Sequence, residues 1–117
     1  MDNPDNESKV FFIPEATAWE TVNDKIERQI VGYNDSIMMV NVRFKKGGVG
    51  SLHKHVHKQL TYISEGVFEV SIGNQKAILG KGSSFLVPSN EIHGVVCLEE
   101  GLLADVFSPI REDFLNN

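Results

Sequence analysis

Residues 47–66 read GGVGSLHKHVHKQLTYISEG, and this stretch decides the fold that we expect. It holds three of the four histidines of the chain, His53, His55 and His57. On a β-strand, residues two apart project from the same face about 6–7 Å apart, so His53 and His55 can both reach one ion at about 2.1 Å. A straight strand would carry His57 roughly 13 Å from His53, which makes it a weaker ligand. A polar strand face exposed to solvent is the alternative interpretation.

The rest of the chain alternates short β-rich runs with Gly, Pro and Asn, a pattern typical of antiparallel barrels and sandwiches. No amphipathic helix of three turns or more is visible, so we predict an all-β fold. We divide the chain into a flexible tail over residues 1–9 and one barrel domain over residues 10–117. One helical turn is expected at 111–115, packing Phe114 against the barrel. The expected strands are 10–13, 26–31, 37–44, 53–57, 61–64, 67–72, 76–79, 84–87, 93–98 and 102–107.

The charge of the chain excludes some classes of partner. With a formal net charge of −5 and no basic run longer than Lys45-Lys46, a surface that binds nucleic acid is not expected. An anionic ligand would instead require individual arginines inside a site. The candidates are Arg28, Arg43 and Arg111.

The apolar stretches and the cysteine content indicate where the protein resides. No apolar stretch approaches the roughly 20 residues of a membrane-spanning helix, so no membrane partner is expected. The first residues are acidic and polar, unlike a secretory signal, and we expect a cytoplasmic protein. Cys97 is the only cysteine, which excludes an intrachain disulfide and is expected to be a small buried side chain.

The opening stretch resembles the first motif of the cupin superfamily, G(X)5HXH(X)3,4E(X)6G. Gly47, His53, His55 and Gly66 match it, and Gln59 stands where the motif has glutamate. The resemblance implies a single-domain double-stranded β-helix, the jelly-roll-like barrel of the cupins.

Residues 82–97 resemble the second cupin motif, G(X)5PXG(X)2H(X)3N. Gly82, Pro88 and His93 match, while Asn90 replaces a turn glycine and Cys97 the final asparagine. Asparagine enters the left-handed region more readily than most residues, so the turn is expected to be retained.

Together the two motifs imply one bound divalent transition metal ion. The implied ligands are His53, His55, Gln59 and His93, although Gln59 can also be read as orienting the substrate. An imidazole-rich set suits Ni, Fe, Zn, Mn or Cu and argues against calcium.

Segments 27–33, 45–50, 55–59 and 105–114 are similar to the pectin-degradation cupins of the KdgF type. Such proteins convert 4,5-unsaturated uronate monosaccharides into the open-chain keto acid. The resemblance implies a metal-dependent enzyme of the uronate lyase or isomerase type with a small acidic sugar as its ligand. It also implies a homodimer formed by sheet packing, with a contribution from the N-terminal strand.

A family pattern, D-x-F-x-x-x-R, follows the second motif and matches Asp105, Phe107 and Arg111. On a strand, Asp105 and Phe107 share one face and can both point into a cavity. The resemblance implies that Asp105 moves a proton, that Arg111 pairs with the uronate carboxylate and that Phe107 shapes the wall facing the sugar. Further candidates for lining the cleft are His57, Gln29, Arg43 and Tyr62.

Two other classes of function stay open at this point. One is a metal-binding cupin that binds a small carbohydrate or acid without catalysis, and the other is a metal-dependent dioxygenase. The fold by itself does not distinguish among the three, because cupin barrels carry many activities.

Overall fold

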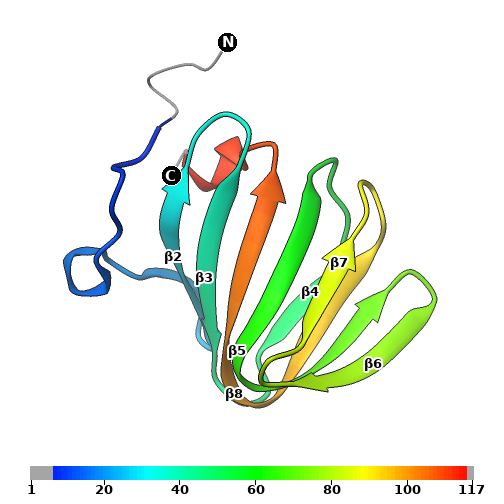
Figure 1. The fold of residues 1–117 in the computed structure, drawn as a ribbon. Helices are drawn as coiled ribbons and strands as arrows, with labels where there is room; N and C mark the ends of the chain where they lie inside the picture. Colours follow the sequence, from blue (N-terminus) through cyan, green and yellow to red (C-terminus); the bar gives the residue numbers. More distant parts are fainter. Residues whose placement is uncertain (1–6, 116–117) are drawn as a thin grey trace.

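The computed structural model describes residues 7–115, so most of the expected tail over residues 1–9 lies outside the described residues. The described chain is built from strands, with two short 3-10 turns, η2 (Pro14–Ala16) and η3 (Glu112–Phe114) (Figure 1). The strands are β1 (Glu20–Asn23), β2 (Ile26–Tyr33), β3 (Met38–Phe44), β4 (Val49–His53), β5 (Lys58–Ile72), β6 (Gln75–Gly80), β7 (Ser84–Val87) and β8 (His93–Ser108). Within residues 7–115, no helix has the length and apolar character needed to cross a membrane.

The two longest strands, β5 and β8, bend and so contribute to both layers of the barrel (Figure 1). They pair antiparallel with each other from Lys58 opposite Ser108 to Ile72 opposite His93, with register shifts at the bend. One half of β8 also pairs with β3 and the other half with β4. One layer is therefore β1-β2-β3-β8-β5-β7 and the other is β4-β8-β5-β6. The layers meet at the bends and open away from them, as in a double-stranded β-helix.

The bend of β5 requires a residue without a side chain. Gly66 has a φ of +87°, and a Cβ there would lie 2.6 Å from the carbonyl oxygens of Glu99 and Glu100 on β8. This crowding explains the glycine that ends the first motif. The second motif makes its turn with Asn90 at a φ of 65°, as the sequence predicted.

A large apolar cluster fills the closed end of the barrel, near the bends. Phe44 and Phe68 pack edge to face with their ring centroids 5.2 Å apart, an arrangement that aromatic pairs favour. Cys97, 1% exposed, lies in the same cluster, which confirms the expected buried cysteine. A second, smaller cluster is formed by Met38, Val40, Phe107 and Ile110.

The all-β fold class is confirmed, but the expected strands differ from the observed ones in several places. Segments 61–64 and 67–72 form the single bent strand β5, and 93–98 and 102–107 form β8. The expected strand 10–13 is absent. In that segment Val10 is 89% exposed and Phe11 83% exposed, because these side chains pack against little of their own chain. The polar strand β1 was missed because its sequence shows no apolar alternation.

The expected strand 53–57 is wrong beyond His53, where β4 ends. The backbone of the next residues is held as a loop against the turn of the second motif: the Asn90 amide donates to the His55 carbonyl at 2.7 Å, and the Ser89 hydroxyl donates to the Val56 carbonyl. The expected helical turn is confirmed as η3, and the ring of Phe114 contacts that of Phe107 with centroids 5.7 Å apart.

Candidate metal centre and cavity

Three histidines converge from separate elements of the barrel. His53 ends β4 and lies opposite His93, the first residue of β8, while His55 follows in the loop after β4. One ring nitrogen of each lies within 4.8 Å of the others, so the three are positioned to bind a metal ion. The ring centroids of His53 and His93 are 4.3 Å apart, and those of His55 and His93 are 4.7 Å apart. Strand parity therefore does not bring His53 and His55 together, because a loop places His55.

The backbone fixes the same tautomer in all three rings. The Nδ1 atoms of His53, His55 and His93 each lie within hydrogen-bond distance of a backbone carbonyl oxygen. The accepting carbonyls are those of Ser51 at 2.7 Å, His57 at 2.8 Å and Glu91 at 2.9 Å. Because a carbonyl only accepts, each Nδ1 carries a proton, and in the neutral form of each ring Nε2 is the atom with the lone pair.

The buried nitrogen of His93 points to a metal ion independently of the motif. His93 is 4% exposed, and its Nε2 is buried without a hydrogen-bond partner. A buried polar atom without a partner costs about 1–3 kcal/mol, a cost that coordination of an ion would remove. The residues present therefore fit a bound metal.

Burial also favours the neutral form of His55 and His93, which is the form that binds metal. It lowers the pKa of His93 to about 4, with the nearby His53, His55 and Arg111 acting in the same direction. The pKa of His55 is lowered as well, chiefly by burial and against the hydrogen bond to the His57 carbonyl. Protons therefore compete little for these two ligands near neutral pH.

Gln59, on β5, presents its amide oxygen to the histidine cluster. Its Oε1 lies 3.1 Å from Nε2 of His55, and its Nε2 donates to the Thr61 hydroxyl at 2.9 Å. Since Nε2 of His55 carries a lone pair, two acceptors face each other across this distance. A cation bound by both atoms would make the contact favourable.

Asp105 lies on β8 beside Gln59, at an inward-facing position. Its Oδ1 accepts hydrogen bonds from the Thr61 hydroxyl at 2.5 Å and from Gln59 Nε2 at 3.2 Å. Burial raises the pKa of Asp105 to about 6, while the hydrogen bond from Thr61, the charge of Arg111 and the hydrogen bond from Gln59 oppose the rise. A carboxyl group with such a pKa can both accept and release a proton near neutral pH.

Arg111 and two phenylalanines also border the site, where the ring centroid of Phe107 lies 5.7 Å from that of His55. The Arg111 guanidinium lies over the rings of Phe107 and Phe114, at 5.0 and 4.3 Å from the centroids. It also donates two hydrogen bonds to Asp113, at 3.0 and 2.8 Å. The guanidinium of Arg28 lies over the ring of Phe114 at 4.0 Å, so this ring contacts two arginines.

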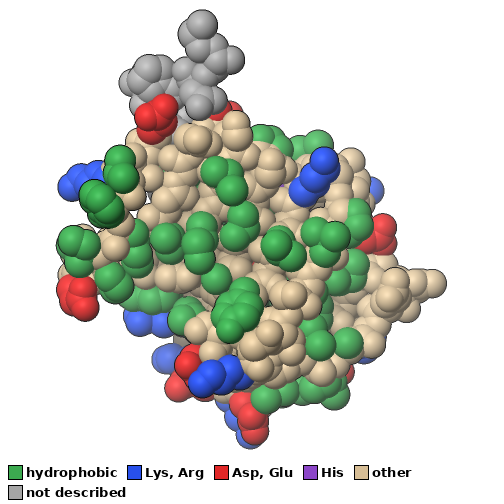
Figure 2. All heavy atoms as spheres, viewed as in Figure 1, with side chains coloured by type: hydrophobic (Ala, Val, Ile, Leu, Met, Phe, Trp, Pro, Cys, Tyr) green, Lys and Arg blue, Asp and Glu red, His purple; other side chains and the backbone are tan. Residues whose placement is uncertain are grey.

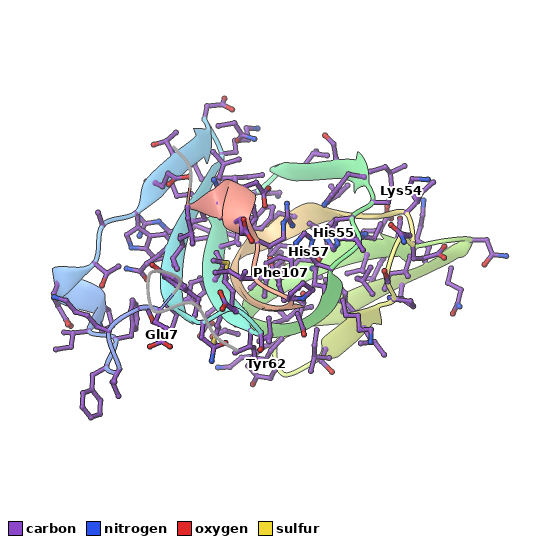
Figure 3. The ribbon with its side chains drawn as sticks, turned by 90° about the horizontal axis from the view of Figure 1, so that it is seen from above. Glu7, Lys54, His55, His57, Tyr62 and Phe107 are labelled. Carbon is purple, nitrogen blue, oxygen red and sulfur yellow. The ribbon has the colours of Figure 1, made fainter. Side chains whose placement is uncertain are left out.

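Most of these groups line one cavity of about 260 Å³ between the layers, and His55 lies next to it, with its ring centroid 4.7 Å from that of His93. Its polar lining includes His53, His93, Gln59, Asp105, Arg28 and Arg111. Its apolar lining includes Val42, Phe44, Phe85, Leu103, Phe107 and Phe114. In Figure 3, the labelled His55, His57 and Phe107 lie close together between the layers, whereas Lys54 and Tyr62 point away. The cavity matches a small polar ligand better than an extended chain.

Several sequence candidates lie elsewhere. Tyr62 is 51% exposed on the outer face, and Gln29 donates to the carbonyls of Pro14 and Thr17 outside the barrel. Arg43 lines a separate surface groove. His57 is excluded from the metal cluster, as expected, and its Nε2 instead lies 3.1 Å from the Ile110 carbonyl.

Thr61 was not identified from the sequence, although it has no measurable exposure and bonds both Gln59 and Asp105. Its position two residues after Gln59 on one strand was the available signal, because such residues share a face. Arg28 was identified only as one of three candidate arginines, and its inward position on β2 distinguishes it from Arg43.

The fold and the histidine cluster together define a cupin with a candidate metal site. The family model for the cupin domain (Cupin_2) matches residues 40–107, and the chain belongs to this family. It is 49% identical over 107 residues to the pectin degradation protein KdgF of Dickeya dadantii (strain 3937). The aligned region covers 90% of this chain and 97% of that protein.

Two solved structures are similar over nearly the whole chain. An RmlC-like cupin from Shewanella frigidimarina NCIMB 400 is 40% identical with a TM-score of 0.91, covering 93% of this chain and 98% of that one. The structure of KdgF from Halomonas sp. is 38% identical with a TM-score of 0.88, covering 92% of this chain and 99% of that one. The resemblance to KdgF-type cupins is confirmed.

Proposed function

We propose that this chain is an enzyme of pectin or alginate breakdown that opens and ketonises 4,5-unsaturated uronate monosaccharides. The support is twofold. The chain is 49% identical to a protein named for pectin degradation. Its cavity also combines a histidine cluster, a carboxyl group and two arginines, which suits a small acidic sugar.

His53, His55 and His93 would hold one divalent transition metal ion, with Oε1 of Gln59 as the fourth ligand. All four side chains are uncharged, so the bound ion would keep its full positive charge and polarise substrate oxygens as a Lewis acid. Ni, Fe, Zn, Mn and Cu are the ions that suit such a ligand set.

The proposed reaction is an isomerisation and needs no co-reactant. The bond between C1 and the ring oxygen breaks, the C1 hydroxyl becomes an aldehyde, and the released enol becomes a ketone at C5. The C1 hydroxyl loses one proton and C4 gains one, so the reaction is balanced. Asp105 would carry this proton on Oδ2, because Thr61 and Gln59 both bond to Oδ1.

Arg111 would pair with the substrate carboxylate, and Phe107 would form the wall against the sugar ring. The Arg111 side chain is 13% exposed and is held by Asp113 and the two rings, so little conformational freedom is lost when it binds an anion. A guanidinium presents paired donors that match a carboxylate.

One observation carries the proposal: the buried Nε2 of His93 that lacks a partner and the carboxyl of Asp105, with its raised pKa, belong to residues that line the same cavity. A metal ligand and a proton carrier in one cavity of this size are what the proposed reaction requires.

The test follows the alkene absorbance of unsaturated galacturonate or mannuronate with purified protein, before and after treatment with a chelator. We expect loss of the absorbance with the metal-loaded protein and none after chelation. Asp105→Asn should lower kcat about 10³-fold, a typical contribution of one general acid–base group. Full turnover by this variant would rule out Asp105 as the proton carrier.

The same assay distinguishes the alternatives. Binding of the sugar without turnover by the native, metal-loaded protein would identify a binding module. Oxygen consumption at an oxygen electrode would identify a dioxygenase, because the proposed isomerisation consumes none.

We further propose that the chain forms a homodimer through the outer face of the layer that contains β3, β8, β5 and β7. Met39, Val106, Leu60 and Leu86 lie side by side across these strands. Leu60 is 51% exposed and Leu86 63% exposed, although the solvent face of an antiparallel sheet is usually polar. Figure 2 shows apolar side chains across this face and no histidine.

The exposed Val10 and Phe11 of the N-terminal segment would complete this interface on the partner copy. Light scattering coupled to size exclusion should give twice the mass of the chain. Leu60→Lys should produce a monomer, whereas Ile78→Lys, at a position on β6 that is 65% exposed, should leave the dimer intact. A monomeric native protein would contradict the proposal.

A further inference from the structure

Thr61, Gln59 and Asp105 form a closed polar network at the edge of the candidate metal centre. Thr61 lies opposite Asp105 in the register of β5 and β8. Its hydroxyl accepts from Gln59 Nε2 at 2.9 Å and donates to Asp105 Oδ1 at 2.5 Å. Gln59 Nε2 also donates to the same carboxylate oxygen at 3.2 Å. Gln59 Nε2, the Thr61 hydroxyl and Asp105 Oδ1 thus each have a defined donor or acceptor role.

The network determines which way the amide of Gln59 points. If the amide were rotated by 180°, its oxygen would face Asp105 Oδ1, and two acceptors would lie about 3 Å apart without a proton between them. The observed orientation instead directs Oε1 to within 3.1 Å of His55 Nε2. Gln59 thus presents an oxygen, which binds metal, rather than an NH₂ group, which does not.

We propose that Thr61 is a positioning residue for the metal centre, acting through Gln59. This inference rests on the metal-binding part of the proposed function and not on the identity of the substrate. Thr61 has no measurable exposure and a fixed hydrogen-bond role, so its hydroxyl holds the amide oxygen toward the ion. Groups that orient metal ligands in this way typically change metal affinity 10–100-fold when removed.

The same geometry explains why glutamine stands where the cupin motif has glutamate. A glutamate at position 59 would place a carboxylate oxygen, in place of the amide nitrogen, 3.2 Å from Oδ1 of Asp105. Two ionised carboxylates at that distance repel each other. Gln59 therefore allows an oxygen ligand and a carboxylate to be neighbours.

The experiment measures Co²⁺ binding in the metal-free protein by competition with a chromophoric chelator, and records the visible spectrum of bound Co²⁺. Thr61→Val should weaken Co²⁺ about tenfold and alter the spectrum, whereas Thr61→Ser, which keeps the hydroxyl, should stay within threefold of the native protein. Thr21→Val, at an exposed threonine on β1, is the control and should leave the affinity unchanged.

A double-mutant cycle separates positioning from general structural damage. In a Gln59→Ala background, Thr61→Val should weaken Co²⁺ less than twofold, because the group it positions is gone. An equal loss in both backgrounds, or no loss in the native background, would overturn the role of Thr61. Thr61→Ala repeats the cycle with a smaller side chain in case valine disturbs the packing. Failure of the native protein to bind Co²⁺ would instead overturn the metal centre itself.

Discussion

The interior of the barrel differs between its closed end and its open end, although the same two strands line both. Near the bends, the inward-facing residues of β5 and β8 are apolar: Ile63, Phe68, Cys97 and Leu103 are each at most 3% exposed. Away from the bends, the inward positions of these strands include Gln59, Thr61, His93 and Asp105. Buried polar groups lower stability unless they are paired, whereas buried apolar groups raise it. The closed end therefore supports the fold, and the open end holds the polar groups of the candidate site.

The largest expected effect comes from removing His93, the buried candidate ligand at the open end. His93→Ala should abolish detectable Co²⁺ binding and lower turnover of the unsaturated uronate at least 10³-fold. The free energy of unfolding of the metal-free protein should fall little or even rise, because the substitution removes a buried nitrogen without a partner. Metal titration, the alkene assay and urea unfolding measure the three quantities. Retention of metal affinity would exclude His93 as a ligand.

The matched substitution at the closed end should lower the free energy of unfolding and leave the Co²⁺ affinity nearly unchanged. Phe68→Ala removes a fully buried ring that packs against Phe44, and should lower the free energy of unfolding by about 3–4 kcal/mol. At a temperature where the variant remains folded, its Co²⁺ affinity should stay within threefold of the native value. A large loss of affinity in the folded variant would show that the two ends are not independent.

A third comparison uses two arginines that make similar contacts: each bonds one glutamate and lies over one aromatic ring. Arg28 bonds Glu20 and lies over Phe114 at 4.0 Å, while Arg43 bonds Glu27 and lies over Trp19 at 3.9 Å. The side chain of Arg28 is 19% exposed and lines the cavity, whereas that of Arg43 is 46% exposed and lies outside it.

Because Arg28, unlike Arg43, adds positive charge to the cavity, Arg28→Gln should raise KM for the acidic sugar about tenfold with a smaller change in kcat. Arg43→Gln should change neither parameter by more than twofold. Steady-state kinetics on the two variants measures this, and equal effects would indicate that Arg28 only stabilises the fold.

The sequence predicted the all-β cupin fold and the proximity of His53, His55 and His93, because both depend on motif spacing and on residue type. It did not predict the polar network, because Thr61 and Asp105 are 44 residues apart and meet only through the register of β5 with β8. A shift of one residue in that register would turn Thr61 outward, and register between distant strands follows from the whole core. Three of the histidines do lie together, as their pattern predicted, but the loop at residues 54–57 was not predicted because it depends on contacts with the second motif.

The smallest expected effect concerns pH, where two buried groups at the open end act in opposite directions on the metal-free protein. The folded-state pKa of His93 is lowered from 6.5 to about 4, so the stability it contributes is present above pH 6.5 and is lost as the pH falls toward 4. The folded-state pKa of Asp105 is raised from 3.8 to about 6, so its contribution grows as the pH falls from 6 toward 3.8.

The two contributions largely cancel, and the pair should change the free energy of unfolding by no more than about 1 kcal/mol between pH 6.5 and 4. Asp105→Asn removes only the opposing contribution of the carboxyl group. This variant should therefore lose more stability than the native protein on acidification, by on the order of 1–2 kcal/mol, in urea unfolding of the chelated proteins. The control is Asp24→Asn, in the turn between β1 and β2 and away from the cavity, which should follow the native pH dependence. If Asp105→Asn also follows it, then Asp105 is ionised in the folded protein throughout this range, and the burial of its carboxyl group does not raise its pKa.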